Sequence, residues 1–100
     1  MYKDLFASQN LDWCEKYVLT QVRYGDKCMR ERGTRYTYIP KRSAEWCGYA
    51  FSEEQLKYTY DKLVAVGIIT VEEYEVCIDG KEPFDSISSV VNEEKLKKIL

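Results

Sequence analysis

The sequence predicts a single domain of the α+β class, and three observations predict it. Its 100 residues are enough for one domain but not for two. Apolar residues recur at helical spacing in two long segments, and each segment begins with a capping pattern. Other segments are rich in β-branched and aromatic residues, and one of them leads into an Asp-Gly turn. The predicted order is therefore helix, short strand, short helix, helix, β-hairpin and C-terminal helix.

The first long helix is predicted to begin at Asp12. Asp12 and Glu15 fit a capping box, in which Asp12 accepts from a first-turn amide and Glu15 reaches back. The apolar stripe behind this start consists of Leu11, Cys14, Val18 and Val22, widened by Tyr17 and Tyr24. Gly25 is a plausible end, although the helix could also continue to Met29.

A short strand and a short helix are predicted next. Residues 34–39 are rich in β-branched and aromatic side chains, which favours a strand that Pro40 ends. Residues 41–47 fit a short helix. Gly48 then stands just beyond its end, where glycine readily adopts the left-handed backbone.

The second long helix is predicted over residues 52–66. Ser52 and Gln55 form its capping box, and the preceding phenylalanine can pack onto Leu56. Its buried stripe is expected to contain Leu56, Tyr60, Leu63 and Val64. Gly67 ends the helix, and the two isoleucines that follow enter the core directly.

A β-hairpin and a last helix complete the predicted fold. Apolar and charged residues alternate within residues 70–78, as expected of a strand. Asp79 and Gly80 suit the centre of a type I′ turn, and Pro83 weakens the returning strand or places it at a sheet edge. The last helix is expected after Asn92, and its inward positions are Leu96 and Ile99.

Two segments, LDWCEKYVLTQVRYG (residues 11–25) and FSEEQLKYTYDKLVAVGIIT (residues 51–70), carry a family resemblance. The second combines a serine cap with apolar residues at fixed spacing and a Gly-Ile-Ile step, at Ser52, Leu56, Leu63, Gly67, Ile68 and Ile69. With the predicted order of elements, they resemble the winged helix-turn-helix domains of phage and plasmid replication initiators and related regulators. The resemblance implies a single domain over residues 1–100, with a leader (1–10), a winged-helix core (11–80) and a C-terminal helix (92–100).

The resemblance implies that the chain binds double-stranded DNA through the helix over residues 52–66, without catalysis. The exposed face of that helix is expected to carry Gln55, Lys57, Tyr58, Thr59 and Lys62. Gln55 could pair with an adenine edge, while the two hydroxyls and Lys62 could reach phosphates. The flanking DNA backbone would be held by Arg35, Lys41 and Arg42. A homodimer that reads two half-sites would provide useful affinity.

Charge is divided unequally along the chain, whose formal net charge is −2. The first fifty residues carry nine basic and six acidic side chains, whereas the last fifty carry six basic and eleven acidic ones. The densest basic stretch spans residues 27–42, and arginine-rich stretches suit phosphate oxygens. The same stretch is also compatible with a solvated loop and strand surface.

A second hypothesis belongs to a different class of function. Residues 72–82 carry five acidic side chains against a single lysine, and two glutamates open the predicted recognition helix. Carboxylates are unfavourable beside DNA phosphates, and nine tyrosines suit a protein interface. These features fit a phage-encoded inhibitor of the anti-CRISPR kind, which binds a host protein through an acidic surface containing Glu72, Glu73 and Glu75. Trp13 and Trp46 are expected to be packing residues rather than ligand platforms.

The composition argues against an enzyme and against a metal or cofactor. The absence of histidine excludes Ser-His-Asp and Cys-His catalysis and all His-ligated metal sites. No Gly-rich phosphate loop, nucleophile elbow or HExxH motif is present. The four cysteines lack CxxC spacing and are expected to be reduced, mostly buried thiols: Cys14, Cys28, Cys47 and Cys77. Without a signal-peptide pattern or a membrane-spanning apolar run, we expect a cytoplasmic protein with no membrane partner.

Overall fold

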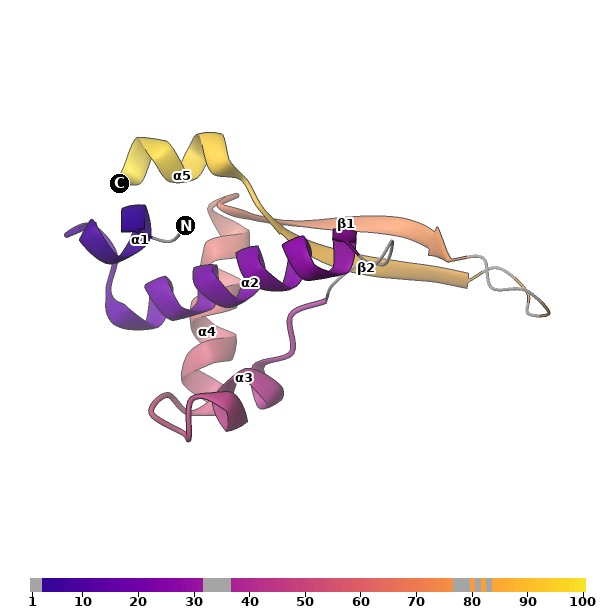
Figure 1. Cartoon of the computed structure of the whole chain (residues 1–100), viewed down its shortest axis with the longest axis horizontal. Helices are drawn as coiled ribbons and strands as arrows, with labels where there is room; N and C mark the ends of the chain where they lie inside the picture. Colours follow the sequence, from indigo (N-terminus) through magenta and orange to yellow (C-terminus); the bar gives the residue numbers. More distant parts are fainter. Residues whose placement is uncertain (1–2, 32–36, 77–79, 81, 83) are drawn as a thin grey trace.

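The computed structural model describes residues 3–31, 37–76, 80, 82 and 84–100, with side chains except at positions 29–30, 73–76 and 84–87. Within this part, five helices and a two-stranded antiparallel sheet make an α+β fold (Figure 1). The elements are α1 (Lys3–Ala7), α2 (Trp13–Glu31), α3 (Pro40–Trp46), α4 (Glu53–Ala65), β1 (Ile69–Val76), β2 (Phe84–Val91) and α5 (Glu93–Ile99). The α+β class predicted from the sequence is confirmed, and the order of elements is compatible with a winged-helix layout.

Polar side chains cap the starts of three helices, and the sequence predicts two of these caps, those of α2 and α4. Asp12 Oδ1 accepts from the Glu15 amide at 2.7 Å, and Glu15 Oε1 accepts from the Asp12 amide at 3.0 Å. Ser52 and Gln55 form the same reciprocal pair at the start of α4, at 3.1 and 3.0 Å. Asn92 caps α5 by accepting from the third amide of the helix. These contacts satisfy amides that a first helical turn would otherwise leave without partners.

Glycine marks the ends of two helices but not of the longest one. Gly48 and Gly67 follow α3 and α4 with φ values of 61° and 81°, a region that residues with a Cβ avoid. In contrast, α2 continues through Gly25 to Glu31, so of the two predicted ends the one at Gly25 is wrong and the continuation to Met29 falls two residues short. The packing of α2 against β2 offsets the cost of about 1 kcal/mol for a glycine inside a helix.

The core lies between α2, α4 and the base of the hairpin. Its fully buried apolar side chains are Leu5, Val18, Leu19, Val22, Ala44, Leu56, Leu63, Ile69 and Leu96. The predicted burial of Leu56 and Leu63 is confirmed, while Tyr60 and Val64 are partly buried and pack against the core. Tyr24 is exposed, so it does not widen the buried stripe of α2 as predicted.

The segment before α2 contains the short helix α1. Leu5 of this helix is fully buried in the core. Phe6, the next residue, is half exposed. A helix of five residues can turn only one or two side chains toward the core, and in α1 the buried one is Leu5.

The strand predicted over residues 34–39 is not present in the part that the structure describes. Residues 37–39 are coil, and residues 34–36 lie outside the described part. Tyr38 joins the core through its ring, which stacks on Tyr60 at a centroid distance of 4.9 Å. The Tyr38 amide donates to Ser89 Oγ at 3.3 Å, so this segment meets β2 through a side chain rather than through strand pairing.

The two strands pair from Ile69 opposite Val91 at the base to Val76 opposite Phe84 at the outer end. This confirms a hairpin close to the predicted position, although β1 begins at Ile69 and ends at Val76. Asp79 lies outside the described residues, so the predicted turn type is not addressed. The outer end of the hairpin extends beyond the helices (Figure 1).

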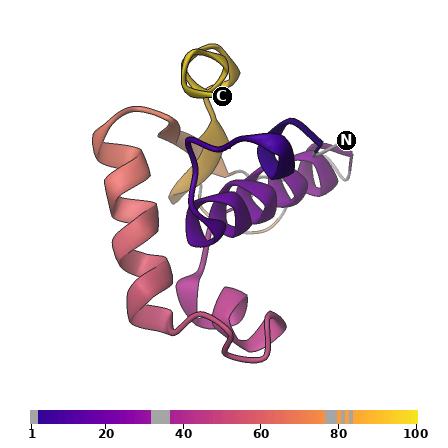
Figure 2. The ribbon, with the colours of Figure 1, turned by 90° about the vertical axis from the view of Figure 1, so that its left-hand side faces the viewer.

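Figure 2 shows how the helices are arranged around α2. The α4 helix stands at one side of the molecule, α3 lies beside its lower end, and α5 lies at the opposite end of the molecule from α3. The side of α4 that faces the core is covered by α2 and the hairpin. None of the other described elements covers the opposite side of α4.

Candidate functional site

The uncovered side of α4 is the position that the winged-helix resemblance assigns to a recognition surface. Its exposed residues recur at helical spacing, and we call them the α4 outer face: Glu53, Glu54, Lys57, Tyr58, Asp61, Lys62 and Ala65. Leu56, Thr59 and Leu63 are buried on the opposite side. The outer face is thus set by the same periodicity that builds the core.

Contacts on the inner side fix the position of α4. The Tyr60 hydroxyl lies 2.6 Å from Ser89 Oγ on β2. Burial raises the pKa of Tyr60, while the bond to Ser89 opposes that shift. A second contact fixes the neighbouring helix α3. The Tyr17 hydroxyl of α2 donates to the Ser43 carbonyl of α3 at 2.6 Å. Both α3 and α4 are therefore anchored to α2 or the sheet by buried or partly buried polar contacts, which favour a single orientation of the outer face.

Both lysines of the α4 outer face lie beside carboxylates. Lys62 Nζ is 3.3 Å from Glu15 Oε2 on α2, and the Glu15 side chain is largely covered. Lys57 Nζ is 3.8 Å from Asp61 Oδ2 one turn later, and both of these side chains are exposed. Such an exposed pair contributes about 0.5 kcal/mol or less. A phosphate that approaches either lysine must therefore compete with a carboxylate already in place.

The first turn of α4 is acidic. Glu53 and Glu54 are exposed, and no cation among the described residues forms an ion pair with either. With Ser52 and Lys57 they line a shallow, open hollow. The positive end of the helix dipole favours carboxylates at this position. In a recognition helix, however, this turn faces phosphates and base edges, which carboxylates repel or suit less well than amide or basic side chains.

One of the residues predicted to contact DNA, Thr59, is buried instead of exposed. Thr59 is only 6% exposed, so its predicted place on the exposed face is wrong. Its hydroxyl lies 3.2 Å from Cys14 Sγ on α2, and burial raises the pKa of that thiol. Thr59 stands three residues after Leu56 and four before Leu63, which places it on the buried stripe.

The other predicted DNA contacts divide into three groups. Lys57, Tyr58 and Lys62 are exposed on the α4 outer face. Gln55 is exposed as well, but its side-chain oxygen accepts from the Ser52 amide in the capping box. Lys41 and Arg42 are exposed in the first turn of α3, and Arg35 lies outside the described residues.

The three glutamates of the alternative interface all belong to β1. Glu72 is exposed and pairs in register with Ser88. Positions 73 and 75 pair with Ile87 and Asp85, and their side chains lie outside the described part. Because successive residues of a strand belong to opposite faces, positions 73 and 75 share a face that position 72 does not.

Three aromatic residues of α3, α4 and the turn between them are exposed, and the sequence predicts this for Tyr58 but not for Trp46 or Tyr49. Trp46 is 65% exposed, Tyr49 67% and Tyr58 72%. The expectation that Trp46 is a packing residue rather than a ligand platform is therefore wrong, because the small residues Ser43 and Ala44 occupy the buried side of α3. Tyr49 has a φ of 62°, which is strained for a residue with a side chain. The turn fixes it there, since its amide donates to the Ala44 carbonyl at 2.9 Å.

Trp13 is also exposed, but it packs against other side chains, as expected of a packing residue. Its ring lies 6.4 Å from the ring of Phe6 on α1, centroid to centroid. Lys16 Nζ stands 4.5 Å from the centroid of the Trp13 ring and donates to the Phe6 carbonyl at 3.3 Å. These contacts bind α1 to the start of α2 from the outside.

Other kinds of site find little support in the described part of the chain. No group of three or more acidic or cysteine side chains there is placed to hold a metal ion. No helix there is long and apolar enough to cross a membrane. Three of the cysteines are free and only partly buried, rather than mostly buried as expected: Cys14, Cys28 and Cys47. Cys77 lies outside the described residues.

No family model, no curated protein and no solved structure matches this chain. The resemblance to winged helix-turn-helix domains therefore depends on the residues of the two helices and on the order of the elements.

Proposed function

We propose that the protein is a non-enzymatic binding protein that docks on a basic surface of a protein partner. The docking surface consists of the α4 outer face, the turn between α3 and α4, and Trp46 at the end of α3. The observation that carries this proposal is the combination of exposed aromatic rings with an acidic first turn on α4. Both lysines of the same face already lie beside carboxylates.

The aromatic residues supply the contact area. Trp46, Tyr49 and Tyr58 each present a large, stiff side chain with a polar tip, and the backbone of Tyr49 is held by its turn. Tryptophan and tyrosine are enriched among the residues that contribute most to protein–protein binding, because they bury much area at a small cost in conformational entropy. These rings would form the apolar centre of an interface.

The acidic residues supply the preference for a basic partner. Glu53 and Glu54 open α4, and Asp61 lies two turns further along the same outer face. The last fifty residues carry five more acidic than basic side chains, so the long-range field of this half of the chain has the same sign. Complementary charge accelerates encounter and excludes acidic partners, including nucleic acids.

Binding to double-stranded DNA is the second candidate, and a specific observation favours it. The short helix α3 precedes α4 and packs against it, an order compatible with a helix-turn-helix, and Lys41 and Arg42 are exposed at the start of α3. If the protein binds DNA, Lys62 would give up its ion pair with Glu15 and contact a phosphate instead. Both candidate functions use α4, so one set of variants discriminates between them.

Affinity capture with the immobilised protein tests the first candidate. The baits are wild type, Tyr58→Ala, the double variant Glu53→Gln/Glu54→Gln, and the control Lys98→Ala, whose exposed site lies on α5. The expected result is a protein retained by wild type and by the control, released by salt, and lost from the two α4 variants. Identical retention by all four baits would contradict the proposal.

Fluorescence anisotropy with a labelled random-sequence duplex tests the second candidate. The titrations are made at roughly 50 and 200 mM salt, a range over which phosphate-driven binding falls steeply. Binding that disappears at the higher salt and in Lys41→Ala/Arg42→Ala would favour DNA. Our proposal predicts no binding at tens of micromolar protein even at the lower salt.

A further inference from the structure

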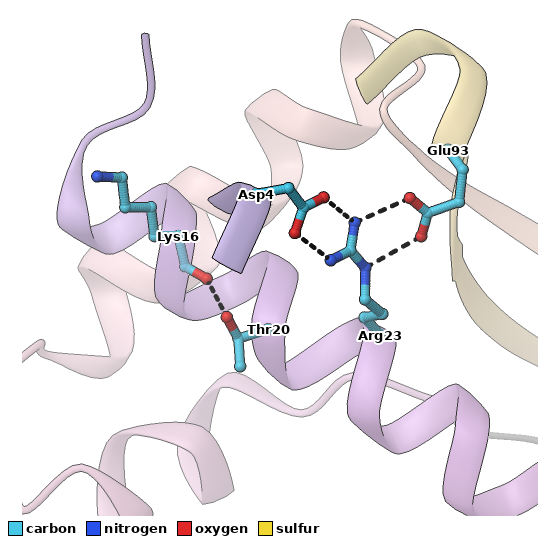
Figure 3. Close-up of polar contacts among 5 residues, drawn as sticks. All are labelled: Asp4, Lys16, Thr20, Arg23 and Glu93. Atoms are coloured by element: carbon cyan, nitrogen blue, oxygen red, sulfur yellow. Dashed lines mark hydrogen bonds and ion pairs between the residues drawn. The ribbon is translucent and has the colours of Figure 1, made fainter. Parts of the chain in front are cut away.

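A single guanidinium joins three helices that are far apart in the sequence. Arg23 of α2 donates to both carboxylate oxygens of Asp4 on α1, at 3.1 Å each. It also donates to both carboxylate oxygens of Glu93 on α5, at 3.0 and 2.8 Å (Figure 3). Bidentate contacts of this kind have a fixed geometry, so the position of Arg23 is defined from two sides at once.

The surroundings of Arg23 make these contacts stronger than ordinary surface pairs. Its side chain is only 15% exposed, whereas the two carboxylates retain partial contact with water. The Arg23 hydrogen bonds lower the pKa of Asp4 despite the opposing effect of burial. Burial alone would lower the pKa of Arg23, but the two carboxylates more than offset it and raise that pKa.

Neither α1 nor α5 is long enough to be stable by itself. They have five and seven residues, and isolated helices shorter than about 12 residues are marginal in water. Each is docked by one fully buried leucine, Leu5 or Leu96. The loop between α1 and α2 also contacts α5, because Asn10 Nδ2 donates to the Ile99 carbonyl at 2.7 Å.

We propose that Arg23 couples the docking of α1 to the docking of α5, so that both helices attach to α2 and detach from it as one unit. Ordering the flexible Arg23 side chain for one bidentate pair leaves less entropy to be lost when the second pair forms. Loss of either carboxylate therefore weakens the contact with the other. Opening the unit would uncover the sites of Leu5 and Leu96, while the anchors of α3 and α4 on other parts of the fold remain in place.

Hydrogen exchange on the full chain tests this coupling, because it reports each helix separately. The amides that report on α1 are those at its C-terminal end, such as the Ser8 amide, which donates to the Leu5 carbonyl, because the first four amides of a helix have no intrahelical partner. In Glu93→Gln, these amides should exchange about 3- to 10-fold faster, where tenfold corresponds to about 1.4 kcal/mol. In Asp4→Asn, the amides of α5 should accelerate by a similar factor. The effect of each substitution on exchange is thus measured in the helix that does not contain the substitution.

Glu94→Gln is the matched control, because Glu94 shares the first turn of α5 with Glu93. It removes the same charge from the helix start. The four hydrogen bonds of Arg23 described above go to Asp4 and Glu93 and do not involve Glu94. The amides of α1 should exchange at the wild-type rate in this variant. Unchanged or slower exchange of α1 in Glu93→Gln would overturn the proposal, and so would equal acceleration by Glu93→Gln and Glu94→Gln.

A variant of Arg23 itself supplies an independent arm. Arg23→Lys keeps the positive charge but loses the planar fork that serves two carboxylates. Exchange should accelerate in α1 and α5 together, while the amides of α4 keep wild-type protection. Acceleration in only one of the two helices would show that their docking is independent and would overturn the proposal.

Discussion

The α4 helix places side chains of opposite roles next to each other. Leu56 is fully buried against α2, and Tyr58 two positions later is among the most exposed large side chains in the described part. Burial of a leucine in a packed core contributes several kcal/mol, because its removal leaves a cavity as well as lost contacts. An exposed tyrosine contributes little to folding, so the Tyr58 ring is free to contribute to binding.

At the scale of the residue, Tyr58→Ala should separate binding from stability. We expect its free energy of unfolding to stay within about 0.5 kcal/mol of wild type, as for other surface substitutions. Leu56→Ala should lose about 2–5 kcal/mol. Urea denaturation measures both, and a loss above 1 kcal/mol for Tyr58→Ala would mean that its ring has a structural role.

Asp4 gives a pH dependence whose sign follows from its lowered pKa. Its contribution to stability is fully present above its ordinary value near 3.8 and is lost as the pH falls through the lower value of the folded state. Asp4→Asn should therefore be less stable than wild type at neutral pH, and the two should converge in strong acid. Denaturation of both proteins across this range measures the difference. A gap that persists unchanged to the lowest pH would exclude ionisation of Asp4 as its cause.

The individual helices begin at positions that local chemistry decides. A capping box needs only two side chains within one turn, so Ser52 and Gln55 reveal the start of α4 from the sequence. Asp12 and Asn92 do the same for α2 and α5. Such signals involve residues three positions apart, which is why they are visible without any knowledge of the fold.

At the scale of the element, Ser52→Ala should destabilise the protein by about 0.5–2 kcal/mol, because the Gln55 amide loses its acceptor. Ser52→Gly should cost only a few tenths of a kcal/mol, since glycine leaves room for water at this amide. Chemical denaturation of the two variants tests the role of the cap. Equal losses in both would show that the capping bond contributes nothing specific.

The features that the sequence did not reveal depend on distant contacts. Gly25 signals a helix end, yet α2 continues to Glu31 and packs against β2. Residues 37–39 have strand-like side chains, but Tyr38 stacks on Tyr60 instead of joining the sheet. In these two cases the residue type suggests one answer and tertiary packing decides another. Thr59 differs, because its polarity suggests the surface while its spacing from Leu56 and Leu63 already indicates burial.

The whole molecule combines two arrangements around α2. On one side, α3 and α4 present aromatic and acidic residues to solvent. On another side, Arg23 ties α1 and α5 together. Since the two arrangements share few residues, substitutions in the α4 outer face and in the Arg23 contacts should have additive effects on stability.

At this scale, binding of the protein partner should depend on salt more steeply in wild type than in Glu53→Gln/Glu54→Gln. The reason is that exposed charges contribute through a long-range field that salt screens. Elution of the captured partner in a salt gradient measures this difference. Identical elution profiles would show that the first turn of α4 does not face the partner.

The most direct test of the central claim is quantitative affinity capture with wild type and Tyr58→Ala side by side. Our account predicts at least one protein that wild type retains and the variant loses, with the variant as stable as wild type. The same proteins at the same levels on both baits would contradict a docking surface on the α4 outer face.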